Sequence, residues 1–350
     1  MTPQVRQSNL ELLRIFCMLM IIGGHVIMVH RTVSNTQSLD FVMSLFLQGT
    51  FAVAVNVFIL ISGYYGIKFK WQKLLKIEIR TWFYSVFLLG ISCLLGWHSL
   101  NFKDDFLLFF PILSKQYWFV TCYVILFLIS PLLNQWAMSW DKKKYERILI
   151  TGFLLIYLWP TMSFLFNAAQ FIDDAGYGIV NFIYLYMLGE YLHYYSDGKG
   201  SILKYWIGFV GSTLLLFLLQ YGLSYILGFE FSSWMSYNTV FVFGGALCLF
   251  LAFRNMQFFS AFVNVCAKPC LAVYLIHLHP RIWYDFCEMI DVASFHGWRY
   301  LLLIIFLPIL IYVTCGFVDC IRNLSLGWGE DGLVLWIEKN CSKLVRKRLL

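Results

Sequence analysis

The sequence predicts an all-α, polytopic membrane protein with about ten transmembrane helices and with both termini in the cytoplasm. Three observations predict this class. Of the 350 residues, 60% are hydrophobic and 13% are charged, which is about half the charged fraction of a soluble domain. Apolar stretches recur along the whole chain, at or near the roughly 20 residues that a helix needs to cross a bilayer. The basic residues gather on one side of these stretches.

The expected spans are joined by short connections, so we expect one integral-membrane domain over residues 1–321. The first span should be retained and not cleaved as a signal peptide, because it holds Glu11, Arg14 and His25 and no small-residue cleavage site follows it. A basic, amphipathic cytoplasmic tail is expected over residues 322–350. The spans are expected at 10–29, 41–62, 81–97, 117–138, 148–166, 179–195, 205–227, 237–253, 269–290 and 299–321.

The distribution of Lys and Arg predicts the orientation. With the N-terminus inside, the inner segments hold 20 of the 26 basic residues and the outer segments hold five, while Arg14 lies within a span. This bias explains the net charge of +7 without a nucleic-acid partner. The expected partner of the basic tail is the anionic headgroup layer of the bilayer.

The chemistry is expected to centre on Arg14 and His25 in the first span. Eleven residues at about 100° each place the two side chains on the same helix face, about 16 Å apart along the axis. Ionisable residues inside a span are costly and by default indicate a functional site. Two structural alternatives stay open: His25 hydrogen-bonded between helices, and Arg14 paired with Glu11 or reaching to the membrane interface.

Two further groups are weaker candidates. The segment 68–80 holds four Lys and Arg80, and it fits either a phosphate-binding cluster or a positive-inside determinant. His277 and His279 are two residues apart, so on a regular helix they diverge by about 200° and do not ligate one metal. A helix break at Pro280 would relax this geometry, but further metal ligands are not evident in the sequence. We therefore expect no metal, and a polar contact between helices for His277, with assistance to catalysis left open. The ten cysteines are scattered and are expected to be packing residues.

Four short motifs follow one another along the chain. They are Glu11-Leu-Leu-Arg14-x10-His25, Asn56-Val-Phe58-Ile-Leu-Ile-Ser62-Gly63-Tyr64, Gln116-Tyr-Trp118-Phe119 continuing to Ser130-Pro131, and Ala272-Val-Tyr274-Leu-Ile-His277. Together they resemble the motifs of acyltransferase family 3, the integral-membrane O-acyltransferases that acetylate surface sugars, mostly in bacteria. The resemblance covers all ten expected helices.

The resemblance implies that acetyl-CoA is the donor, on the cytoplasmic side, and that a glycan or glycolipid is the acceptor. It implies that His25 is catalytic and that Arg14 is essential, in donor handling. The family's basic residues after the second helix map onto Lys76 and Arg80, although Glu78 interrupts a segment that is usually rich in Arg. Substrate-facing or supporting roles are expected for Glu11, Asn56, Ser62, Trp118 and His277.

The sequence thus predicts a multi-pass O-acetyltransferase of the plasma (inner) membrane, in which His25 acts as general base or as acyl carrier. The alternative is a transporter or flippase for a lipid-linked sugar or small metabolite. Such a protein is expected to have paired repeats and broken helices in corresponding halves of the chain, and neither is evident in the sequence.

Overall fold

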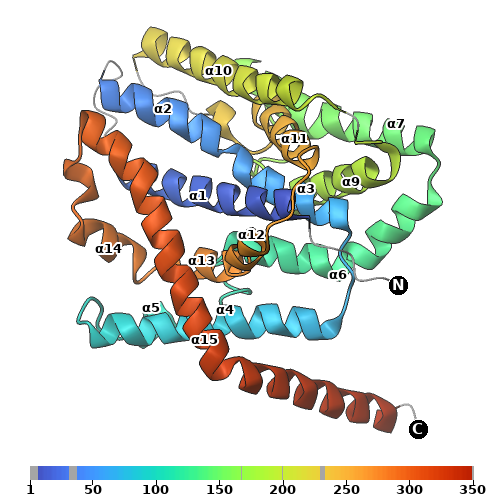
Figure 1. Ribbon diagram of the computed structural model, residues 1–350, viewed down its shortest axis with the longest axis vertical. Coiled ribbons are helices and arrows are strands. Elements are labelled where there is room, and N and C mark those ends of the chain that lie inside the picture. The colour runs from blue at the N-terminus through green and yellow to red at the C-terminus, as the bar shows by residue number, and fades with distance from the viewer. Residues whose placement is uncertain (1–6, 31–37, 167, 199, 229–232, 349–350) are drawn as a thin grey trace.

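The structure, a computed structural model, describes residues 7–30, 38–166, 168–198, 200–228 and 233–348 (Figure 1). The described residues form helices and no strand. The α-helices are α1 Ser8–His30, α2 Leu39–Phe51, α3 Val53–Tyr65, α4 Trp71–Leu94, α5 Phe102–Asp105, α6 Trp118–Ser139, α7 Lys142–Phe153, α8 Trp159–Phe166, α9 Ile179–Tyr195, α10 Ile202–Leu227, α11 Val240–Arg254, α12 Ala261–Cys266, α13 Cys270–His277, α14 Trp283–Met289 and α15 Gly297–Arg348. Four single turns, η1 to η4, lie at Phe106–Phe109, Leu154–Leu158, Ser233–Met235 and Val292–Ser294.

The chain is a multi-pass membrane protein. Seven helical segments of the described chain are long and apolar enough to cross a bilayer: Ser8–His30, Leu39–Tyr65, Trp71–Leu94, Trp118–Ser139, Lys142–Phe164, Ile202–Leu227 and Gly297–Asn340. The exact number of ten spans and the cytoplasmic placement of both ends stay predictions. Two other expected spans form shorter helices, α9 with 17 residues and α11 with 15. Their lengths, about 26 and 22 Å, fall short of the roughly 30 Å hydrocarbon core.

The expected single span at 269–290 is wrong, because the chain breaks there into α13 and α14. Pro280 provides the physical reason: it has no backbone N–H to donate, and it disfavours helical geometry at the residue before it. The break is anchored from outside the segment. His279 Nε2 lies 2.9 Å from the Ser85 carbonyl oxygen of α4, and Arg281 Nε donates to Asp105 of α5 at 3.0 Å.

The first helix lies at the centre of the bundle (Figure 1). It packs against α2, α3, α11, α12, α13 and α15. Its neighbour α3 is pressed against α9, where a side chain at Gly63 or Gly189 would collide with the backbone of Tyr186 or Leu60. Small residues allow two helix backbones to approach this closely. The centre of the bundle therefore holds α1 and α3, the two helices that carry the first two motifs.

The last helix continues without a break through the expected boundary at residue 321, so the tail is an extension of the final span. Figure 1 shows α15 crossing the bundle and then turning, and after the turn Gln72 of α4 still donates to Glu338 at 2.6 Å. Arg322 and Glu330 lie eight positions apart, and their side chains meet at 2.7 Å. Eight residues of a straight helix rise about 12 Å, so this ion pair spans the turn.

Candidate active site

A cavity of about 750 Å³ runs along α1. It is lined by α1 residues from Arg14 to Val29, a stretch of about 22 Å, and by residues of α2, α3, α4, α6, α13, α14 and several connecting segments. Arg14 and His25 both line it, as their helical spacing predicts. This stretch of α1 equals about three-quarters of the thickness of a hydrocarbon core. Two ionisable side chains of one helix thus face a shared internal space.

The Arg14 end of the cavity holds an ion pair. Arg14 Nη1 lies 3.6 Å from Glu11 Oε2, one turn earlier on α1, and the Glu11 side chain is buried. The predicted pairing with Glu11 is therefore present, but it leaves the arginine incompletely bonded. Arg14 Nε is buried and has no hydrogen-bond partner among the described residues, and the side chain as a whole is 37% exposed. The guanidinium retains donors for a ligand in the cavity.

His25 is bonded to a second histidine behind the cavity wall. Its Nδ1 lies 3.2 Å from His277 Nε2, and His277 Nδ1 lies 2.6 Å from the Val273 carbonyl oxygen one turn earlier on α13. The Trp283 ring packs edge-on against both imidazoles. His25 lines the cavity, whereas His277 is buried behind it, so the predicted contact between helices is the one that joins these two rings.

The opposite end of the cavity is aromatic. Trp118, at the start of α6, lies against Tyr177 and Tyr237, with ring centroids 4.6 and 5.9 Å away. All three rings line the cavity, as does the predicted residue Ser62 on α3. The two tyrosines come from the segments that precede α9 and α11. Sequence reasoning missed both of them, because aromatic residues near span ends are common in any membrane protein.

A buried amide pair holds these aromatic segments in place. Asn56 Nδ2 donates to the Tyr237 carbonyl oxygen at 2.8 Å, and Asn181 Nδ2 donates to Asn56 Oδ1 at 3.2 Å and to the Gly176 carbonyl oxygen at 3.0 Å. The Tyr157 hydroxyl donates to Asn181 Oδ1. Asn56 thus lies behind the wall and supports it. Asn181, a polar residue in the apolar first half of its span, is the signal by which sequence analysis could have found this network.

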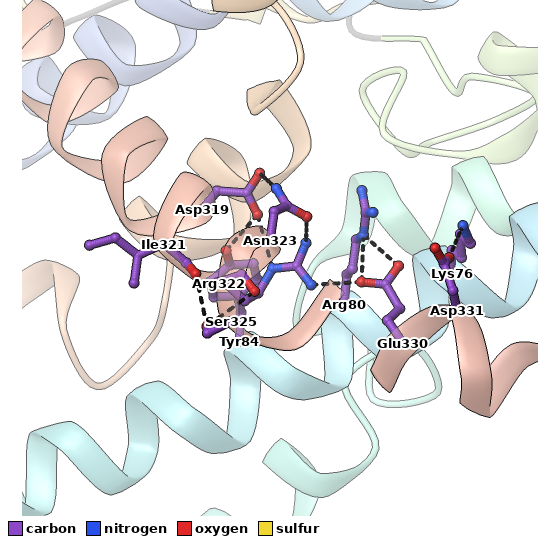
Figure 2. Close-up of polar contacts among 10 residues, drawn as sticks. All are labelled: Lys76, Arg80, Tyr84, Asp319, Ile321, Arg322, Asn323, Ser325, Glu330 and Asp331. Atoms are coloured by element: carbon purple, nitrogen blue, oxygen red, sulfur yellow. Dashed lines mark hydrogen bonds and ion pairs between the residues drawn. The ribbon is translucent and has the colours of Figure 1, made fainter. Parts of the chain in front are cut away.

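Lys76 and Arg80 lie elsewhere, in an ion-pair network between α4 and α15 (Figure 2). Lys76 Nζ contacts Asp331 at 2.5 Å, and Arg80 Nε donates to Glu330 at 2.9 Å. Neither cation lines the cavity, although Ile77 between them does.

The network continues into the interior through Arg322, which contacts both Glu330 at 2.7 Å and Asp319 at 3.0 Å. The Tyr84 hydroxyl donates to Asp319 at 2.8 Å. Two arginines and two carboxylates form a group with no net charge. Its members Asp319, Arg322 and Glu330 are buried, so this part of the network holds two helices together and leaves little free positive charge for an anionic ligand.

Within the described residues, no group of three or more His, Cys, Asp or Glu side chains is placed to hold a metal ion.

The fold and cavity define a multi-pass membrane protein with an ionisable, partly aromatic internal chamber. A family model described as an acyltransferase domain matches residues 7–322. The chain therefore belongs to acyltransferase family 3, as its four motifs predict. The match covers every cavity-lining residue. It ends at Arg322, so it includes Asp319 and Arg322 of the buried ion-pair network but not Glu330. No curated protein and no solved structure gave a match.

Proposed function

We propose that this chain is an O-acetyltransferase of the plasma (inner) membrane, with acetyl-CoA as donor and a cell-surface glycan or its lipid-linked precursor as acceptor. The family supports acyl transfer in general. The observation that carries the proposal is the shared cavity, because Arg14 and His25 face one internal space that extends for about 22 Å. A donor bound at one end and an acceptor bound at the other can meet at the imidazole.

Arg14 would hold the donor. The excess of basic residues supports a cytoplasmic location for the Arg14 end of α1, the side on which acetyl-CoA would be available. The guanidinium has a buried, unpartnered Nε and is partly exposed, so it can donate to a carbonyl of the pantetheine arm or to a phosphate. Lys76 would contribute to phosphate binding by exchanging its exposed partner Asp331, whereas Arg80 is held by the buried Glu330.

The aromatic end would receive the acceptor. Trp118, Tyr177 and Tyr237 line the cavity, and a sugar ring has a C–H face that packs against aromatic rings. The Asn56–Asn181 pair fixes the two tyrosine segments in place. A hydroxyl of a sugar stacked there would point along the cavity toward His25.

The reaction then needs a proton acceptor at the meeting point, and His25 supplies one. His25 takes the proton of the acceptor hydroxyl as the hydroxyl oxygen bonds to the thioester carbonyl carbon. The carbon–sulfur bond breaks, the electron pair goes to sulfur, and the thiolate takes the proton back from His25. The products are an O-acetyl ester and the free thiol, and the histidine returns to its starting state.

In the two-step alternative, the acetyl group passes first to an imidazole nitrogen of His25 and then to the acceptor. The two routes differ in one measurable respect. A burst of free thiol before any acceptor is added would indicate the acyl-histidine, and a strict need for acceptor would indicate direct transfer.

The test of the function is consumption of acetyl-CoA by the purified protein together with acetylation of surface glycans in cells, both read by mass spectrometry. His25→Ala should abolish both and leave expression and chromatographic behaviour unchanged. His193→Ala, an exposed histidine at the end of α9 away from the cavity, is the matched control and should be active. A protein that leaves acetyl-CoA intact while moving a lipid-linked sugar would establish the transporter instead.

A further inference from the structure

The hydrogen bonds behind the cavity determine which ring nitrogen of each histidine carries a proton. The Val273 carbonyl oxygen is only an acceptor, and His277 Nδ1 lies 2.6 Å from it, so this nitrogen must donate. In a neutral imidazole the other nitrogen then holds a lone pair. His277 Nε2 is therefore an acceptor, and the His25 Nδ1 that faces it at 3.2 Å must donate.

A doubly protonated His277 would reverse the second bond, but its surroundings oppose that state. The residue is 4% exposed, and among the described residues its ring contacts one imidazole, one carbonyl and the rings of Trp283 and Tyr274. A buried cation with no carboxylate beside it is strongly disfavoured. The neutral arrangement is the one that this pocket supports.

From this order of donors and acceptors we infer that His277 is a positioning residue, which holds His25 in the tautomer with the proton on Nδ1 and the lone pair on Nε2. The inference rests on the proposed function for its catalytic meaning. His25 lines the cavity and His277 does not, so Nε2 is the nitrogen left for the reaction. It accepts the hydroxyl proton in direct transfer, and it carries the acetyl group in the two-step route.

The hydrogen-bonded chain from His25 through His277 to the Val273 carbonyl, called the relay below, differs from a Ser-His-Asp arrangement in the group that accepts from the reactive histidine. There a carboxylate accepts from the imidazole and stabilises the imidazolium. Here a neutral imidazole accepts from His25, and the backbone carbonyl of Val273 orients that second ring. A neutral partner avoids the cost of a carboxylate in the membrane interior. When His25 gains its second proton on Nε2, the bond from Nδ1 to His277 remains in place.

Two substitutions separate positioning from simple packing. His277→Gln retains an acceptor oxygen near the place of Nε2, whereas His277→Leu retains the bulk and removes the acceptor. We expect acetyl transfer to fall by roughly 10²–10⁴-fold for His277→Leu, the upper end being the effect of a wrong tautomer in the Ser-His-Asp triad. The activity of His277→Gln should stay within about 10-fold of the wild type, because the glutamine oxygen can still accept the hydrogen bond from His25 Nδ1.

His279→Leu is the matched control for damage to this segment. His279 is equally buried, two residues away, but it bonds the Ser85 carbonyl oxygen and lies outside the relay. Its loss should lower thermal stability without changing the protonation pattern of His25.

The direct readout is ¹⁵N NMR of the full-length protein labelled at its histidine rings, which needs no substrate. Assignment by His25→Ala should show a protonated Nδ1 and an unprotonated Nε2 for His25, and His277→Leu should convert this to a mixture of tautomers. A wild-type His25 with its proton on Nε2, or full activity of His277→Leu, would overturn the inference. Failure of the wild type to consume acetyl-CoA would refute the proposed function and leave the tautomer result standing on its own.

Discussion

Glu330 is the residue whose loss should most weaken the contact between α4 and α15. Its carboxylate is 5% exposed and accepts from Arg80 Nε at 2.9 Å and from Arg322 Nη1 at 2.7 Å. Glu330→Gln keeps the shape and removes the charge, so both arginines lose a carboxylate at once. Removing one partner of a buried ion pair costs about 3–5 kcal/mol.

The expected loss lies at the lower end of that range. Arg322 still contacts Asp319, and Arg80 is 33% exposed and can be hydrated. A loss of about 3 kcal/mol corresponds to a decrease in Tm of roughly 6–12 °C, at 2–4 °C per kcal/mol for a large domain. The assay is thermal unfolding of the detergent-solubilised protein, followed by intrinsic fluorescence and by the fraction that remains monodisperse.

Asp331→Asn is the matched control. This neighbouring carboxylate is 63% exposed and pairs with Lys76, so its loss should change the unfolding temperature very little. Added salt should weaken the Asp331 pair and have little effect on the Glu330 network. If Glu330→Gln unfolds at the same temperature as Asp331→Asn, the buried network does not stabilise the fold and the reasoning fails.

Three further predictions concern the cavity and its surroundings. Arg14→Gln should lower acetyl-CoA consumption by at least about 100-fold, while Arg14→Lys should retain part of it, because both the positive charge and the paired N–H donors of the guanidinium contribute. Equal rates for the wild type and both variants would exclude a role in donor binding. Asn56→Leu removes the hydrogen bond to the Tyr237 carbonyl oxygen, so it should lower acceptor acetylation more than acceptor-free hydrolysis of the thioester. The free energy of unfolding should fall by about 1–3 kcal/mol. An unchanged ratio of the two activities would contradict a positioning role for Asn56. Burial alone would raise the pKa of Asp105. Hydrogen bonds from Asn101 and His98 and the charge of Arg281 lower it by more than burial raises it, so the net pKa lies below its usual value. The stability from Asp105 is therefore present above the ordinary carboxyl pKa and is lost as the pH falls below about 4. Melting curves between pH 3 and pH 6 should show this loss in the wild type and not in Asp105→Asn.

The fold class and one wall of the site follow from simple patterns in the sequence. Composition and apolar stretches indicate a helical membrane bundle, because a bilayer requires every backbone polar group to be satisfied within helices. The shared face of Arg14 and His25 follows from the 100° step of one helix, a local property that needs no knowledge of other segments.

Contacts between distant segments could not be predicted in this way. Lys76 and Arg80 have the composition of a phosphate site, yet their partners Glu330 and Asp331 lie about 250 residues later in the chain. The same holds for Asn56, which contacts Tyr237 at a separation of 181 residues. The sequence of a basic cluster is the same whether its counter-ions are phosphates or the carboxylates of another helix, so only the tertiary structure distinguishes the two.

The length of α15 has a mechanical consequence for the whole molecule. A helix of 52 residues measures about 78 Å, well beyond the 40–45 Å of a bilayer with its headgroups. Its C-terminal part therefore extends outside the hydrocarbon layer, and it carries the exposed rings of Trp328 and Trp336, residues that favour the headgroup depth. Because the turn is held to α4 through the ion pair of Arg80 and Glu330, a displacement of this C-terminal part would be transmitted to α4, whose Ile77 lines the chamber.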